Sequence, residues 1–203
     1  DESKKDGSIG VEYIFADDYT FLGNAGSVFI DSGRDIDVTA IYSYSSSGNG
    51  GDINLLADNS IDLQQANILS YSSFGKSGNV NLFANNSIQL ERSLINSSTT
   101  AGRENGGDIS IKTPQLELKG TSVITAGTSS RSSGDGGNIK VDAERLTIDE
   151  GSTIVSNSLG FGKGGDIAIN ATDLIEVIGF SRAGTSGILS AALGIDDGGN
   201  INI

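Results

Sequence analysis

Apolar and polar residues alternate along most of the chain in short runs, and the apolar positions come in pairs that are two residues apart. From residue 107 onward the pairs are Ile109 with Ile111, Leu116 with Leu118, and Val123 with Thr125. Residues two apart lie on one face of a β-strand but on different sides of a helix. The pattern therefore predicts units of three short strands, each with one apolar face.

The same unit recurs along the sequence, and each copy begins with a glycine that is followed by Asp or Asn. The starts read GGDINLLA, SGNVNLFA, GGDISIKT, GGNIKVDA, GGDIAINA and GGNINI. The anchors are Gly51 and Asp52, Gly78 and Asn79, Gly107 and Asp108, Gly137 and Asn138, Gly165 and Asp166, and Gly199 and Asn200. Successive anchor glycines are 27 to 34 residues apart. A fixed period of this length is typical of a solenoid.

One unit cannot bury its own apolar face, so the units are expected to stack. Stacking aligns Ile53, Val80, Ile109, Ile139, Ile167 and Ile201 in the first strands, Ile61, Ile88, Leu116 and Leu146 in the second, and Ile68, Ile95, Val123 and Ile154 in the third. An inward ladder of hydroxyl groups would run beside the third column, through Ser70, Ser97, Thr125 and Ser156. We therefore expect an all-β, right-handed parallel β-helix with three short strands per coil and about seven to eight coils.

The repeat divides the chain into an atypical N-terminal coil, residues 1–25, and a repeating shaft, residues 26–203, within one domain overall. The N-terminal part is rich in aromatic residues, of which Tyr13, Phe15, Tyr19 and Phe21 are candidate contact residues. Their rings would either cover the end of the core, as solenoid caps do, or form a surface for assembly or for glycan binding. Both interpretations stay open at this point.

The units also differ in length, and the extra residues follow the third strand. These segments are rich in serine, glycine and threonine, so they are expected to project as loops from one edge of the rod. Phe74 and Phe161 are the two aromatic residues placed there. We interpret them as candidate contact residues, with simple anchoring of the loops as the alternative.

Composition narrows the classes of partner and of chemistry. The formal net charge of −13 disfavours nucleic acid and anionic membrane surfaces as partners. No apolar run approaches the length of a spanning helix, so direct membrane insertion is not expected. The chain contains no cysteine and no histidine, which removes the usual ligands of zinc, copper and iron together with the thiol nucleophile and the imidazole base. No cofactor is expected.

The Gly-Asp/Asn corner has three interpretations. A phosphate-binding loop would need a lysine followed by Ser or Thr at the start of a helix, whereas a strand follows here. A calcium-binding roll would need a period of about nine residues. The third interpretation is structural: Asx side chains bond backbone N–H groups two residues on, and the paired glycines supply positive φ. We favour the structural corner, with calcium as the alternative.

Parallel β-helices also host enzymes that act on polysaccharides, and such an enzyme is the alternative function. Hydrolysis would need two carboxyl groups at a defined separation, for which Asp17 with Asp18 and Asp196 with Asp197 are the candidates. Both pairs fall in expected turns, where solvated acids are common. We therefore expect no catalytic residue and no enzymatic activity.

The recurring GG-[DN]-I-x-[IL] stretch, followed by a strand of the form S-x-I-x-[ST], resembles the repeat region of filamentous-haemagglutinin-like exoproteins of the two-partner secretion class, most of all the cyanobacterial type. The similarity covers residues 26–203. The resemblance implies a secreted, cell-surface protein with a right-handed β-helical shaft and a role in adhesion, aggregation or biofilm formation. The family's N-terminal secretion domain, with its NPNG-type motif, has no counterpart in this sequence, so the chain would be a segment of the shaft.

Two kinds of partner follow from this interpretation. The sequence stops at GGNINI, one strand into a new coil, and an open coil has unpaired backbone groups that invite pairing. Other copies of the chain, or further repeats of the same chain, are therefore expected to stack end to end, and head-to-tail contacts of this kind would propagate into a fibre. Cell-surface glycans or the extracellular matrix are the expected external partners.

Overall fold

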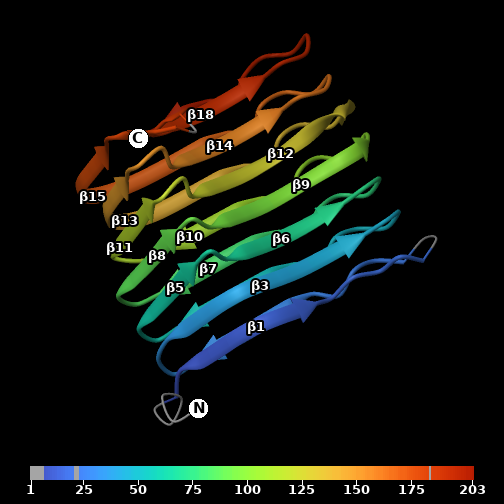
Figure 1. Cartoon of the computed structure of the whole chain (residues 1–203). Coiled ribbons are helices and arrows are strands. Elements are labelled where there is room, and N and C mark those ends of the chain that lie inside the picture. Colours follow the sequence, from blue (N-terminus) through green and yellow to red (C-terminus); the bar gives the residue numbers. More distant parts are fainter. Residues whose placement is uncertain (1–6, 21–22, 183) are drawn as a thin grey trace.

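The computed structural model describes residues 7–20, 23–182 and 184–203, and in them it forms a right-handed parallel β-solenoid. Seventeen strands join in one continuous sheet that winds around the axis (Figure 1). The N-terminal end lies at the bottom of that view and the C-terminal end at the top. The described residues contain no helix that is long and apolar enough to cross a membrane.

Three walls make up the solenoid, and each wall contains one strand, or half of one longer strand, from every complete coil. The first wall consists of β2 (Val28–Ser32), β4 (Ile53–Ala57), β7 (Val80–Ala84), β10 (Ile109–Lys112), the first halves of β13 (Ile139–Ile148) and β15 (Ile167–Val177), and β19 (Ile201–Asn202). The second wall consists of the first halves of β1 (Ile9–Phe15) and β3 (Ile36–Ser45), then β5 (Ser60–Gln64), β8 (Ser87–Glu91), β11 (Gln115–Lys119) and the second halves of β13 and β15. The third wall consists of the second halves of β1 and β3, then β6 (Asn67–Ser72), β9 (Leu94–Gly102), β12 (Val123–Ser132), β14 (Thr153–Ser158) and β18 (Gly187–Ala192).

The described residues form about six complete coils, fewer than the seven to eight expected. The difference arises at the two ends. Strand β1 contributes only to the second and third walls, and β19 contributes only to the first wall. The expected count included these partial coils as whole ones.

Columns of aliphatic side chains fill the interior, with the same register from coil to coil. The first and second columns follow the predicted order, since Ile53 pairs with Val80, Val80 with Ile109, Ile61 with Ile88, and Ile88 with Leu116. Most of these side chains are completely buried. Because parallel strands in register place like side chains one above another, the core is a stack of nearly identical layers.

The third column departs from the prediction at one coil. Ile124, rather than Val123, pairs with Ile95 and is fully buried, and Ala126 takes the place predicted for Thr125. The corner before β12 contains one residue more than the corner before β9. Gly120 and Thr121 both have positive φ there, whereas Arg92 alone does so in the preceding coil. One added residue moves every following side chain to the other face of its strand.

The predicted loops are partly strand. Strands β9 and β12 continue to Gly102 and Ser132, so they contain much of the two segments that were expected to project. Short turns at one edge then lead each coil into the next, on the right in Figure 1. Between the second and third walls of the last coil, β16 (Phe180–Ser181) pairs antiparallel with β17 (Gly184–Thr185), outside the main sheet.

Candidate functional site

The Asp/Asn column at the start of the first wall links successive coils through hydrogen bonds. In each coil the side-chain Oδ1 accepts the backbone N–H of the equivalent residue one coil further along. The pairs are Asp52 with Asn79, Asn79 with Asp108, Asp108 with Asn138, Asn138 with Asp166, and Asp166 with Asn200, at 2.7–3.0 Å. These bonds join neighbouring coils, whereas the sequence favoured bonds to N–H groups two residues on in the same coil. An amide and a carboxylate serve equally well because only an acceptor oxygen is required.

The anchor glycines are explained by close approach of the backbones. A Cβ on Gly51, Gly78, Gly107, Gly137, Gly165 or Gly199 would lie 2.0–2.2 Å from a carbonyl oxygen of the preceding coil. None of these glycines has positive φ, so the conformational reason expected from the sequence does not apply. Any side chain at these positions would force the coils apart.

Buried hydroxyl groups form a second set of links between coils. Ser70 Oγ donates to the carbonyl of Gly51 at 2.8 Å and accepts the N–H of Gly78 at 2.9 Å. Ser97, Ser156 and Ser190 also donate to an anchor-glycine carbonyl, and Ala126 interrupts the ladder where Thr125 was expected. A parallel column, which the sequence analysis missed, contains Ser45, Ser72, Thr99, Thr128 and Ser158. The signal for it in the sequence was a second serine or threonine two residues after the first, as in Ser70 and Ser72.

The N-terminal aromatic residues lie on the outer face of the third wall and do not cover the end of the core. Tyr13, Phe15 and Tyr42 stack with ring centroids 6.3 and 5.1 Å apart and nearly parallel planes. A second stack, in which Tyr44 lies between Tyr19 and Tyr71, has centroid distances of 5.4 and 4.8 Å. The end of the core is instead packed by partly buried aliphatic residues of β1 and its neighbourhood, namely Ile9, Val11, Ile14 and Ala16. Phe21, the remaining candidate, lies outside the described residues.

Asp17 sets the electrostatics beside the second stack. Its carboxylate accepts the Tyr19 hydroxyl at 3.2 Å and the backbone N–H of Tyr44 at 2.9 Å. The negative charge of Asp17 raises the pKa of Tyr19 above its ordinary value. Burial raises the pKa of Tyr71, with Asp17 as a smaller cause. Both phenols therefore keep their protons to a higher pH than an ordinary tyrosine does.

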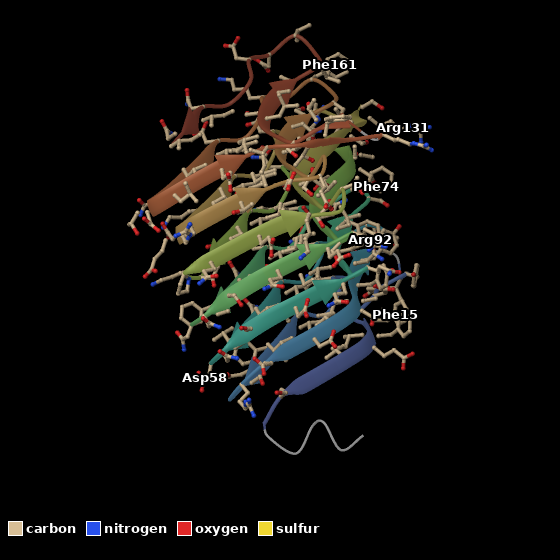
Figure 2. The ribbon with its side chains drawn as sticks, turned by 60° about the vertical axis from the view of Figure 1, so that its left-hand side comes forward. Phe15, Asp58, Phe74, Arg92, Arg131 and Phe161 are labelled. Atoms are coloured by element: carbon tan, nitrogen blue, oxygen red, sulfur yellow. The ribbon has the colours of Figure 1, made fainter. Side chains whose placement is uncertain are left out.

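A groove of about 480 Å³ lies at the edge where the third wall turns into the next coil. Its lining combines one aromatic ring, one guanidinium and several hydroxyl groups, contributed by Phe74, Arg131, Ser73, Thr100, Ser129 and Ser130. Figure 2 shows Phe74, Arg131 and Phe161 projecting from this one edge. Phe161 does not line the groove, although its side chain is exposed to the same extent as that of Phe74 (63% against 61%). Sequence reasoning placed both phenylalanines at this edge, and it placed Arg131 near the same edge without assigning it a role.

A second groove, of about 590 Å³, lies where the first wall turns into the second. Asp142 and Glu144 line it together with Lys112 and Phe83, and the Lys112 ammonium lies 5.8 Å from the centre of the Phe83 ring. Asp142 forms an ion pair with Lys140 at 2.7 Å. Neither acid was among the predicted candidates, although the two are only two residues apart in the sequence.

The acids predicted as candidates, Asp17 with Asp18 and Asp196 with Asp197, lie outside the two grooves described above. Asp17 bonds to Tyr19 and Tyr44, while Asp18 accepts the backbone N–H and the hydroxyl of Thr20. These bonds hold the pKa of Asp18 below its ordinary value. Asp196 and Asp197 are exposed in the bend after β18. Within the described residues, no three Asp or Glu side chains gather closely enough to hold a metal ion.

Comparison of the chain with protein-family models, with curated proteins and with solved structures found no match.

Proposed function

We propose that the chain is a shaft segment of a secreted, cell-surface protein of the filamentous-haemagglutinin-like kind, which mediates adhesion, aggregation or biofilm formation. The resemblance of the repeated Gly-Asp/Asn corner supports this proposal, and so does the solenoid. A rod that repeats one layer along its axis holds a contact surface at a distance from the cell, which is the mechanical task of a shaft.

The observation that carries the proposal is that the same hydrogen bond links every pair of neighbouring coils along the Asp/Asn column. The bond from Asp52 to the N–H of Asn79 recurs at each corner up to Asn200, with nearly the same length. The contacts between one pair of neighbouring coils are the same as those between the next pair. Such a rod can therefore be lengthened without a new kind of contact. An enzyme needs one unique site, whereas a shaft needs uniform layers.

Assembly end to end is part of the proposal. Several apolar side chains at the C-terminal end are exposed, among them Leu193, Ile195, Ile201 and Ile203. Apolar surface of this kind is stabilised when it is covered. We propose that another copy, or further repeats of the same chain, covers it by continuing the three walls.

Electron microscopy of the purified chain tests the assembly. Rods that join into long fibres as the protein concentration rises are the expected result. Substitution of Ile201 by proline should shorten them, because the N–H at the equivalent positions, Ile53 and Ile167, bonds to the following coil and proline lacks that N–H. Isolated short rods at every concentration would contradict assembly from separate copies.

An enzyme that acts on polysaccharides is the second candidate, and one observation favours it. Asp142, Glu144 and the cationic Lys112 line one groove beside β13. Two carboxyl groups beside an extended groove are the minimum that glycoside hydrolysis requires. Release of reducing ends from a panel of polysaccharides, abolished by Asp142→Asn or Glu144→Gln, would support the enzyme. Polymers of unchanged length after prolonged incubation would support the shaft.

A further inference from the structure

Arg131, which lines the groove at the turning edge, is a cation without an acidic partner among the described residues. Arg92 pairs with Glu91 and Arg145 pairs with Asp173. In the part of the chain that the structure describes, no carboxylate lies within ion-pair distance of the Arg131 guanidinium, which is exposed. At the edge of this groove, in a chain with a net charge of −13, the Arg131 guanidinium offers five N–H donors in a planar arrangement that suits a carboxylate or a sulfate.

The rest of the groove supplies one apolar face and a polar rim. The Phe74 ring is exposed. The hydroxyls of Ser73, Ser129 and Thr100 already bond to Tyr44 or to backbone carbonyls, but each hydroxyl oxygen retains acceptor capacity. The Ser130 hydroxyl has no partner among the described residues. A ligand that fits must therefore combine a flat apolar patch, several hydroxyl groups and a negative charge.

We propose that this groove binds an anionic sugar residue of a polysaccharide, with its ring against Phe74 and its carboxylate or sulfate on Arg131. The volume of about 480 Å³ lies within the range of small-molecule sites, roughly 300 to 1,000 Å³. This inference rests on the proposed adhesive function and gives that function a chemical class of partner.

A peptide fits the groove less well. Peptides that bind to a sheet do so by adding a strand to an unpaired edge. At this groove the two strands are already bonded to each other, since Arg131 pairs with Ala101 and Ser132 with Gly102. The groove therefore offers side chains but no free backbone ladder.

Titration calorimetry on the 203-residue chain tests the site with three tetrasaccharides of equal length: a galacturonate, a sulfated galactan and a neutral galactan. We expect at least one anionic probe to bind, and the neutral probe to bind at least about tenfold more weakly. Binding of the galacturonate would identify a carboxylate as the preferred anion, and binding of the sulfated probe alone would identify a sulfate. Equal binding of the neutral probe would overturn the proposal. A glutamate-rich peptide is a fourth probe, and its binding as tightly as the anionic sugars would also overturn the proposal.

Three variants locate the binding. Arg131→Gln and Phe74→Ala should each lower the affinity for the anionic probe about tenfold. The circular dichroism spectrum and the melting temperature should stay unchanged. Phe161→Ala is the matched control, because Phe161 is equally exposed at the same edge but lies outside the groove, and it should leave binding unchanged. An equal loss in Phe161→Ala would overturn the assignment to this groove. A chain that binds no probe but still forms fibres would refute the groove and leave the shaft intact.

Discussion

The carboxylate of Asp108 lies 2.7 Å from the backbone nitrogen of Asn138, one coil further along the axis. The Asn138 amide oxygen in turn accepts the N–H of Asp166 at 2.9 Å. Each corner of the solenoid thus holds the next through one acceptor oxygen, and the charge of the side chain is not needed for this role.

Substitution of Asp108 tests the importance of that oxygen. Asp108→Ala should lower the free energy of unfolding by about 1 kcal/mol, because the N–H of Asn138 loses its acceptor. Asp108→Asn should change it by less than about 0.5 kcal/mol, because the amide keeps the oxygen, as in Asn79 and Asn138. Urea denaturation followed by circular dichroism measures both values. A large loss in the Asn variant would show that the charge, not the acceptor, is required.

Substitution of an anchor glycine should lower the free energy of unfolding more than substitution of Asp108 does. A Cβ on Gly107 would lie 2.2 Å from the carbonyl oxygen of Gly78, so Gly107→Ala should destabilise the chain by about 3 kcal/mol or more. Gly33 is the matched control, since nothing lies within 4 Å of its Cβ position. Gly33→Ala should leave the free energy of unfolding within about 0.5 kcal/mol of the original. Equal effects of the two substitutions would refute close approach as the reason for the glycines.

The register of β12 can be tested with two neighbouring residues. Ile124 is fully buried and Val123 is half-buried. Ile124→Ala should cost about 3 kcal/mol through loss of apolar burial and formation of a cavity. Val123→Ala should cost less than about 1 kcal/mol. The reverse order in a denaturation experiment would restore the register that the sequence first suggested.

The titration of two tyrosines depends on Asp17 to different degrees. The charge of Asp17 is the largest cause of the raised pKa of Tyr19, whereas burial is the largest cause for Tyr71. Asp17→Asn should therefore return the pKa of Tyr19 most of the way to its ordinary value and leave that of Tyr71 raised. Nuclear magnetic resonance of the tyrosine rings between neutral and alkaline pH measures both. Equal downward shifts would contradict the assigned causes.

The same raised pKa values give stability a direction with pH. A phenol whose pKa is raised on folding contributes stability that is fully present below the pKa of the unfolded chain, about 10. That contribution is lost as the pH rises through the higher pKa of the folded chain. Stability should therefore fall at strongly alkaline pH, and Tyr71→Phe should reduce the fall. An unchanged alkaline profile in Tyr71→Phe would contradict this expectation.

The sequence was sufficient for the architecture because one signal repeats in every coil. The Gly-Asp/Asn corner fixed where each first wall begins, and the apolar pairs then aligned Ile53 with Val80 and Ile61 with Ile88, as the structure has them. The error at Val123 came from a corner whose length changes by one residue at Gly120, and no apolar pattern reveals such a change.

The candidate site was less accessible from sequence, again for a reason of geometry. Arg131 reaches the groove of Phe74 because the register shifts between Thr128 and Arg131 where β12 pairs with β9. The two residues are far apart in the chain and belong to segments of unequal length. Their proximity depends on how each coil absorbs its extra residues, which only the folded backbone determines.

We propose, as the central claim, that the folded chain contributes to adhesion and leaves the polymers of the surface uncut. Retention of beads under flow measures it most directly: beads that carry the native chain pass over a surface coated with an acidic polysaccharide, beside beads that carry the chemically unfolded chain. The account predicts that the native chain retains the beads, that the unfolded chain does not, and that the coating keeps its length. Beads that detach equally in both cases, or a coating that is shortened by the native chain, would contradict it.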